Sequence, residues 1–408
     1  MKSIFTLFVF SLFYFTSAQS QDSYSLLWDR YGSAITSAEN LYTLHAATYA
    51  FKDRYLKHSY WDESTKKGKA LGIGYRLGKT VLVDFQIDYF AVLFQHEVFG
   101  HGYRYREFGF ERNSYNILVG PPYSKGGGFA SRGRSLRDIY LDEHSTMSFG
   151  GSESNTVFAN TIRDYWWTTN TISYSSTLLY GMTRHDLTRY ILRTKYLEER
   201  GDVVAYAIFL KERENADGQS IIDDAARHTL INLLDPYSYI AGIAYLKYLI
   251  NAEEEMTLPT LHLGNVDWLP TVQFNLTPFG GEFQLVNSFR TQRTMWHTTF
   301  RHGDNRFENF WGIGGQWLQL PSKKLQVGAT LDLWQQPSSR IGRAGADSEI
   351  VTRDGLGGRV IGHLRLPLTQ ALQMRADVGY KTTGYTLGEA LDRGLILRVG
   401  LSFVSPTE

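Results

Sequence analysis

Two histidines and a glutamate lie within one short stretch, as His96, Glu97 and His101 in the sequence HEVFGHG. A zinc ion binds neutral imidazole nitrogens, and zinc-dependent hydrolysis needs a carboxylate beside the attacking water. In the familiar helical arrangement, H-E-x-x-H, the histidines are four residues apart and share one helix face. The stretch therefore predicts a zinc site with Glu97 as general base, although its histidines are five residues apart.

The five-residue spacing requires a departure from regular α-helix geometry if both histidines are to bind one metal. At about 100° per residue, the second ring of a regular α-helix lies roughly 140° from the first, too far to share one metal. A one-residue π-bulge brings the rings together, and such bulges are frequent at functional sites. Gly100, directly before His101, lowers the resistance of the backbone to this distortion. We therefore expect a π-turn here, the alternative being a core helix whose histidines only hydrogen-bond to neighbours.

This spacing resembles the HExxGH motif of the dipeptidyl-peptidase III family of zinc metallopeptidases, including the Gly-His-Gly ending at Gly102. The resemblance covers about seven residues of the 408. It implies that His96 and His101 bind zinc, that Glu97 activates water, and that a second glutamate some fifty residues downstream completes the metal shell. Glu153 lies 52 residues after His101 and is the predicted third ligand. The family places paired acids at this point, whereas Glu153 has no acidic neighbour.

Other residues compete with Glu153 for the third ligand position. His144 is one, because imidazole also binds zinc well, and it can alternatively stabilise a developing oxyanion. Glu143 is another candidate. Glu153 follows Ser152, a possible helix N-cap, and an acid in the first helical turn is also favoured for electrostatic reasons alone. The third ligand therefore stays open between Glu153, His144 and Glu143.

The start of the chain predicts export. A positive Met1-Lys2-Ser3 precedes the apolar residues 4–15, and small residues follow at 16–18, which is typical of a signal peptide over residues 1–20. The chain has no cysteine, so neither disulfides nor a lipid-modified cysteine are expected. The net charge of +1 and the lack of a basic run give no indication of a nucleic-acid partner. We expect an outer-membrane location, with the periplasm or secretion as alternatives.

The hydrophobic pattern divides the mature chain in two. Residues 21–256 are predicted to form a mostly helical metal-binding domain, with an amphipathic helix over 23–54 and short strands at 71–76 and 80–83. Over residues 257–408 the pattern alternates strictly, as in Leu331 and Leu333 against Asp332 and Trp334. About eight such segments, each about ten residues long, suit membrane-crossing strands. Aromatic residues near strand ends suit an interfacial girdle, namely Trp268, Trp296, Trp317, Trp334 and Tyr385. A soluble sheet would instead bury the apolar face against the helical domain.

The predicted fold class is α+β, with a zincin-like helical N-terminal domain followed by an antiparallel β-barrel of about eight strands, which resembles bacterial outer-membrane barrels. The predicted function is Zn²⁺-dependent hydrolysis of a peptide or other amide substrate beside outer-membrane lipid. Two other functions stay open. One is a barrel component of transport or assembly with a closed, four-ligand structural zinc. The other is a zinc hydrolase acting on lipid or cell-wall bonds.

Overall fold

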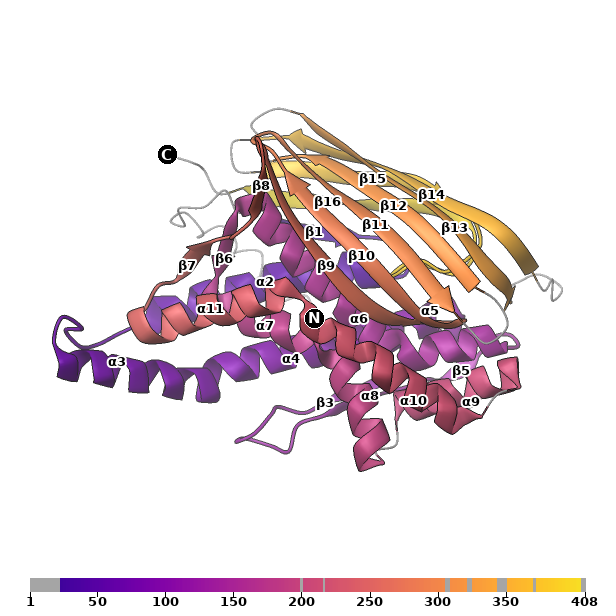
Figure 1. Ribbon diagram of the computed structural model, residues 1–408, viewed down its shortest axis with the longest axis horizontal. Helices are drawn as coiled ribbons and strands as arrows, with labels where there is room; N and C mark the ends of the chain where they lie inside the picture. The colour runs from indigo at the N-terminus through magenta and orange to yellow at the C-terminus, as the bar shows by residue number, and fades with distance from the viewer. Residues whose placement is uncertain are drawn as a thin grey trace.

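The computed structural model describes residues 23–198, 201–215, 217–304, 309–320, 325–342, 351–369 and 372–404. The predicted signal peptide lies outside these residues. One large, curved sheet arches over a group of helices, and the two parts pack directly against each other (Figure 1). Among the described residues, no helix is both long enough and apolar enough to cross a membrane.

The helical part occupies most of the chain before residue 252. Helix starts carry recognisable caps: the Ser33 side chain accepts a hydrogen bond from the Thr36 amide at the start of α2, and Asp235 with Pro236 begins α11. The helices are α2 Ala34–Tyr55, α3 Lys66–Lys79, η1 Thr80–Asp84, α4 Phe85–His96, η2 Glu97–His101, α5 Gly102–Glu107, α6 Leu141–Thr169, α7 Tyr174–Arg184, α8 Asp186–Leu197, α9 Asp202–Glu214, α10 Gly218–His228, η3 Thr229–Leu234 and α11 Pro236–Asn251.

Helix α6 is the centre of this part. It is buried along most of its length and packs against α2, α4, α7 and α9. Phe158, Ile162, Trp166 and Trp167 on α6 are all fully buried in the hydrophobic core. Because α6 contacts the helices that carry the motif and also the sheet, it fixes the position of the motif relative to the rest of the molecule.

Several short strands connect these helices, and long strands follow them. The strands are β1 Ser23–Trp28, β2 Phe110–Glu111, β3 Ser114–Ile117, β4 Gly128–Ser131, β5 Arg134–Ser135, β6 Thr171–Ser173, β7 Glu255–Thr257, β8 Leu261–Leu263, β9 Val266–Thr277, β10 Gly280–Arg290, β11 Thr294–Asp304, β12 Asn309–Gln319, β13 Gln326–Ile341, β14 Val351–Pro367, β15 Leu372–Lys381 and β16 Gly394–Val404. Strands β2–β5 form two small hairpin-like sheets, β6 pairs with β7, and the remaining strands form the large sheet.

The predicted closed barrel is wrong. The large sheet has ten antiparallel strands in the order β1-β16-β15-β14-β13-β12-β11-β10-β9-β8, and it is open. Its two edges, β1 and the β8–β9 pair, do not meet. Helix side chains bind backbone groups on both edges, as Thr43 does at Ser25 and Asn232 does at Phe274. The fold is therefore an open antiparallel sheet that arches over the helices, in place of the predicted closed barrel.

Two local predictions in the first hundred residues also fail. Residues 23–28, predicted as the start of a helix, form β1 and pair with β16 at the far end of the chain. Residues 71–76 and 80–83, predicted as strands, lie in α3 and in the π-helix η1. Their β-branched and apolar residues favour strands locally, but packing against α11 overrides this preference.

The two faces of the sheet have opposite polarity. Leu331 and Leu333 are about half exposed on the outward face, whereas the adjacent Trp334 points inward and is buried. Tyr385 is buried as well, so the prediction that these two residues belong to an interfacial girdle is wrong. The inward face also carries buried polar residues such as Gln284, Ser288 and Arg398. The alternative of a soluble sheet that buries its apolar face against the helices therefore does not hold.

Candidate metal centre

The motif lies in a helix that changes its winding, as the spacing predicted. α4 continues without a break into the π-helix η2, Glu97–His101, and then into α5. The wider turn brings the two rings to the same side, with centroids 5.0 Å apart and the Nε2 atoms 3.3 Å apart. The predicted π-turn is confirmed. Gly100 has an additional role there, because a Cβ at this position would lie 2.6 Å from the carbonyl oxygen of Gly150 on α6.

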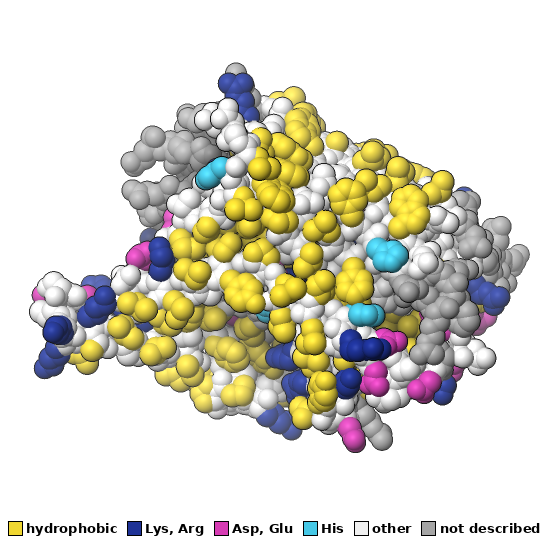
Figure 2. All heavy atoms as spheres, in the orientation of Figure 1, with side chains coloured by type: hydrophobic (Ala, Val, Ile, Leu, Met, Phe, Trp, Pro, Cys, Tyr) yellow, Lys and Arg dark blue, Asp and Glu magenta, His cyan; other side chains and the backbone are white. Residues whose placement is uncertain are grey.

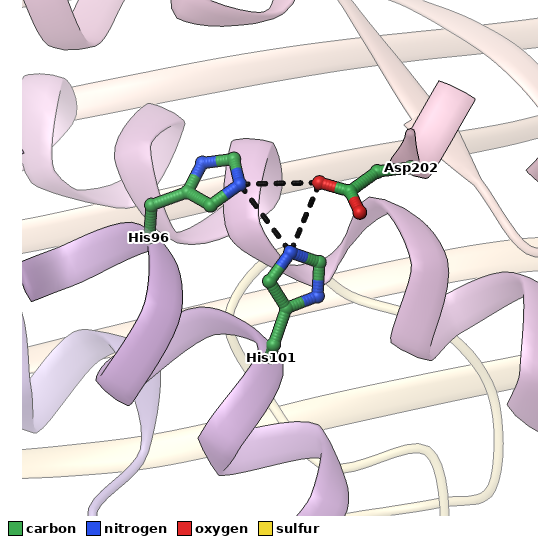
Figure 3. Close-up of side chains that lie close together, drawn as sticks. All are labelled: His96, His101 and Asp202. Atoms are coloured by element: carbon green, nitrogen blue, oxygen red, sulfur yellow. Dashed lines mark hydrogen bonds and ion pairs between the residues drawn. The ribbon is translucent and has the colours of Figure 1, made fainter. Parts of the chain in front are cut away.

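A third ligand-type atom comes from a distant helix. Asp202, the first residue of α9, places Oδ2 3.2 Å from His96 Nε2 and 3.0 Å from His101 Nε2 (Figure 3). The three side chains point toward one common centre (Figure 3). Within the described part of the chain, this is the one group of three His, Cys, Asp or Glu residues whose ligand atoms come close enough to hold a metal ion.

The other nitrogen of each ring is oriented by a hydrogen-bond acceptor. His96 Nδ1 lies 3.3 Å from Asp186 Oδ2, and His101 Nδ1 lies 2.8 Å from the carbonyl oxygen of Met147. Asp186 is buried and also accepts hydrogen bonds from Ser152 and Asn155. An acceptor at Nδ1 favours the tautomer with the proton on Nδ1, which leaves the Nε2 lone pair of both histidines directed at the common centre.

The spacing of these three atoms fits a tetrahedral zinc ion. Ligands about 2.1 Å from a tetrahedral ion lie about 3.4 Å apart, and the three observed separations are 3.0, 3.2 and 3.3 Å. Three electron-pair donors at these distances repel each other unless protons or a cation lie between them. A Cβ on Gly151 of α6 would lie 2.3 Å from His96 Nε2, so the site is formed against the bare backbone of this glycine. The donors and their surroundings therefore fit zinc.

The electrostatics agree with a site built for positive charge. Burial opposes protonation of His96, but hydrogen bonds to Asp186 and Asp202 outweigh it and raise its pKa well above the usual value. His101 has its pKa raised in the same way, against burial, mainly by the negative charge of Asp202. Burial opposes ionisation of Asp202, yet the neighbouring His101 and His96 hold its pKa far below the usual range. A cation at the centre would take the place of these protons.

Glu97 lies at the start of η2, beside both histidines and next to the hairpin of β3 and β4. It is buried, and among the described residues none donates a hydrogen bond to its carboxylate. Burial raises its pKa, and the charges of His96 and His101 act in the opposite direction. A Cβ added to Gly128, the first residue of β4, would lie 3.1 Å from Glu97 Oε1. The carboxylate is thus unpaired and faces the start of β4.

The loop before β4 is held in place by α4. The Gly127 amide donates a hydrogen bond of 2.7 Å to the Tyr89 hydroxyl. Gly126 and Gly127 have φ values of 72° and 97°, in the left-handed region that favours glycine, and a Cβ on Gly126 would overlap the Tyr89 hydroxyl at 2.5 Å. The glycine-rich turn therefore positions β4 against Glu97.

A phenol lies at the edge of the centre. The Tyr190 hydroxyl on α8 accepts a hydrogen bond of 3.4 Å from the backbone amide of Asp202, and its ring centroid lies 6.2 Å from that of His96. Within the described residues, no acceptor takes the proton of this hydroxyl. Burial raises the pKa of Tyr190, so the hydroxyl stays protonated at neutral pH and remains a hydrogen-bond donor.

The structure does not bring Glu153 to the histidines. Both of its oxygens accept hydrogen bonds from the Arg104 guanidinium at 2.6–3.0 Å, and Oε1 also accepts from the Gly388 amide. α6 begins at Leu141, so Glu153 lies in the middle of this helix and not in a first turn capped by Ser152. Arg104 neutralises the carboxylate, and Asp202 occupies the place that Glu153 was predicted to take.

The two rival ligands are also elsewhere. The His144 ring stacks on Phe209 with centroids 4.7 Å apart, and its Nδ1 accepts a hydrogen bond from Arg132. Glu143 is held by Arg137 and by the Tyr140 and Gly342 amides. Neither side chain belongs to the group that converges on His96 and His101.

Sequence reasoning missed Asp202 and Asp186. Asp186 directly precedes residues 187–211, and Asp202 lies within them. This stretch has helical periodicity throughout and is most simply read as a single helix. The structure instead ends α8 at Leu197 and begins α9 at Asp202, directly after Gly201. An acid that follows a glycine at a helix start was the available signal, since such acids are favoured at helix N-termini.

Comparison with known proteins adds no further constraint. No protein-family model matches the sequence, no curated protein matches it, and no solved structure matches the fold. The function therefore has to be argued from the geometry of His96, His101, Asp202 and Glu97.

Proposed function

We propose that this protein is a zinc-dependent hydrolase, and most specifically a peptidase. The observation that carries the proposal is the convergence of His96, His101 and Asp202 at separations of 3.0–3.3 Å, with the unpaired carboxylate of Glu97 beside them. Catalytic zinc sites use three protein ligands and leave one position open, whereas structural sites use four. Since the described residues supply three, the arrangement favours catalysis over a purely structural metal.

His96, His101 and Asp202 would hold the metal. When bound, zinc supplies a Lewis acid that makes a coordinated water more acidic and polarises a substrate carbonyl. Glu97 takes the proton of the attacking water as general base and delivers it to the leaving amine. Asp186 and the Met147 carbonyl keep the two rings in the ligating tautomer.

Tyr190 is the best candidate for the group that stabilises the developing oxyanion. Its hydroxyl has a free proton and lies next to Asp202. A donor that is already oriented when charge develops lowers the barrier without further reorganisation. A Tyr190→Phe variant should lower kcat by about 10²-fold while KM and zinc content stay close to the wild type.

Two features favour a peptide over other amide substrates. The side chain of Asp202 is 30% exposed, so the centre opens to solvent on the side of α9. Strand β4 begins beside Glu97 and pairs only with β3 among the described strands, which leaves one strand edge free. An extended peptide can add to such an edge through main-chain hydrogen bonds.

The test is a substrate screen with a matched pair of variants. Purified protein with one zinc per chain is incubated with a peptide pool, with phospholipids and with muropeptides, and the products are identified by mass spectrometry. Glu97→Gln should lose at least about 10²-fold in kcat on the substrate that is cleaved and keep its zinc. Glu111→Gln changes an exposed glutamate on β2 and should behave like the wild type.

Each outcome of the screen decides between functions. Cleavage of peptides alone supports the peptidase. Cleavage of lipids or muropeptides alone would keep the hydrolase but replace its substrate class. No cleavage of any substrate by the zinc-loaded protein, or full activity in Glu97→Gln, would overturn the proposal.

A further inference from the structure

The outward face of the large sheet is a continuous apolar surface. Alternate positions in residues 281–289, 296–302, 309–319, 327–335, 356–366, 372–380 and 395–403 point outward, and in these ranges they hold no Lys, Arg, Asp or Glu. Many are large apolar side chains with more than a third of their surface exposed, for example Phe300, Leu331, Val360 and Leu395. In the space-filling view, hydrophobic side chains gather over these strands and along α11, while charged side chains collect at the far left tip and the lower right (Figure 2).

The inward face of the same strands carries many buried charged and polar side chains beside apolar ones such as Met295 and Phe310. Glu282, Arg301, Arg375, Asp377 and Arg398 are all buried between the sheet and the helices. Arg398 pairs with Glu389 at 2.7 Å, and Arg375 pairs with Glu39 at 3.2 Å. A sheet in water gains stability by doing the opposite, because each Å² of apolar surface removed from water contributes about 25 cal/mol. This polarity suits a surrounding medium that is itself apolar.

Helix side chains bind backbone groups at both open edges of the sheet. On β1, the Ser25 amide donates to Thr43 Oγ1 and the Ser25 carbonyl accepts from it, while Asn40 binds the Leu27 amide and carbonyl in the same way. On β9, Asn232 of η3 binds both the amide and the carbonyl of Phe274.

Two further positions on the β9 edge need no neighbouring strand for one of their backbone groups. Arg184 donates to the Val272 carbonyl, and Pro270 has no amide hydrogen to satisfy. An open sheet edge is excluded from lipid hydrocarbon because its unpaired groups cost several kcal/mol each. Here helix side chains lower that cost at Ser25, Leu27, Val272 and Phe274, which favours contact of an open sheet with an apolar medium.

Aromatic side chains form two rows across the strands on the outward face. Trp268, Phe289, Trp296 and Trp317 are direct cross-strand partners on β9, β10, β11 and β12. A second row, Phe283, His302 and Trp311, crosses β10, β11 and β12. It lies six residues from the first row, counted on β11 from Trp296 to His302. Six residues of strand span about 20 Å, close to the apolar band of a protein in a bilayer with aromatic rings at both interfaces.

From these observations we infer that the outward face of the large sheet contacts the hydrocarbon of a lipid bilayer, with the helices sealing its two edges. The face is convex (Figure 1), so a second copy of this chain could touch it only along a narrow strip, whereas lipid follows the curvature. The inference is independent of the hydrolase and concerns where the protein resides.

The experiment transfers the purified full chain from detergent into phosphatidylcholine vesicles and measures flotation and quenching of tryptophan fluorescence by brominated lipids. The wild type should float with the vesicles and its fluorescence should be quenched. Leu331→Lys with Val360→Lys places two charges on facing residues in the middle of the band, and should lower the vesicle-bound fraction at least about tenfold. Leu197→Lys changes an exposed leucine on α8 and should bind like the wild type.

Two results would overturn the inference. One is a wild type that stays monodisperse in detergent-free buffer and does not float. The other is a stable dimer in detergent-free buffer that the two lysines dissociate, which would assign the face to a second copy. If the lysine variants fail to fold, the quenching measured on the wild type still decides, since it requires no substitution. Zinc content, measured in parallel, reports on the metal centre separately.

Discussion

His96 is positioned from two sides, by the carboxylate of Asp186 at Nδ1 and by the backbone of Gly151 below Nε2. Asp186→Asn should therefore lower zinc affinity by about 10–100-fold, because the ring loses the charged acceptor that fixes its tautomer. Competition with a fluorescent zinc chelator measures this. Asp223→Asn, at a partly exposed aspartate of α10 that pairs with Lys195, is the control and should leave the affinity unchanged. Equal affinities for wild type and Asp186→Asn would show that Asp186 does not position the ligand.

Part of this centre could be predicted from the sequence and part could not. The i and i+5 histidines indicate a π-turn, since only that distortion lets both rings share a metal, and η2 has this form. Asp202 was missed because it lies 101 residues from His101 and reaches it only through the break between α8 and α9. Glu153 had the spacing of the resembled motif, but its carboxylate forms an ion pair with Arg104.

At the scale of helices, the contact between α4–η2 and α6 depends on glycines. Gly151→Ala should weaken zinc binding strongly, because the new Cβ would occupy space within 2.3 Å of His96 Nε2 and displace the ring. Gly150→Ala is the neighbouring control, since its Cβ would meet the Arg104 side chain at 3.0 Å and not a ligand. Zinc titration of both variants tests the prediction. A similar loss of affinity in both would mean that α6 only supports the site generally.

The Arg104–Glu153 pair ties α5 to α6 and should contribute to stability and not to metal binding. Both side chains are buried, and removing one partner of such a pair leaves the other charge without compensation. Glu153→Gln should lower the free energy of unfolding by about 3 kcal/mol. The folded fraction should retain one zinc per chain. Loss of zinc from a stably folded Glu153→Gln variant would instead indicate that Glu153 is a metal ligand.

The strands of the large sheet show what periodicity can and cannot establish. The alternation of apolar and polar residues predicted long antiparallel strands with one apolar face, and β13, β15 and β16 have this form. Whether the edges of a sheet meet is not encoded in that alternation. It depends on Asn40, Thr43 and Asn232, whose side chains take the hydrogen bonds that a neighbouring strand would make in a barrel.

At the scale of the whole molecule, metal binding should stabilise the fold, because α9 and α4–η2 are far apart in sequence and meet at the three ligands. At zinc concentrations about 100 times Kd, binding contributes about 2.7 kcal/mol to the folded state. Removing zinc with a chelator should therefore lower the melting temperature, and reloading should restore it. The Asp202→Ala variant should show little response to the chelator. A melting temperature that never depends on zinc would argue against a bound ion.

The metal content of the purified protein decides whether His96, His101 and Asp202 form a zinc centre. Wild type, His101→Ala, Asp202→Ala and Glu153→Gln are loaded with zinc, freed of excess metal and measured by elemental analysis. We predict about one zinc per chain in the wild type and in folded Glu153→Gln, and none in the other two variants. Zinc retained by Asp202→Ala, or a wild type that binds no zinc after loading, would show that these three residues do not form a zinc centre.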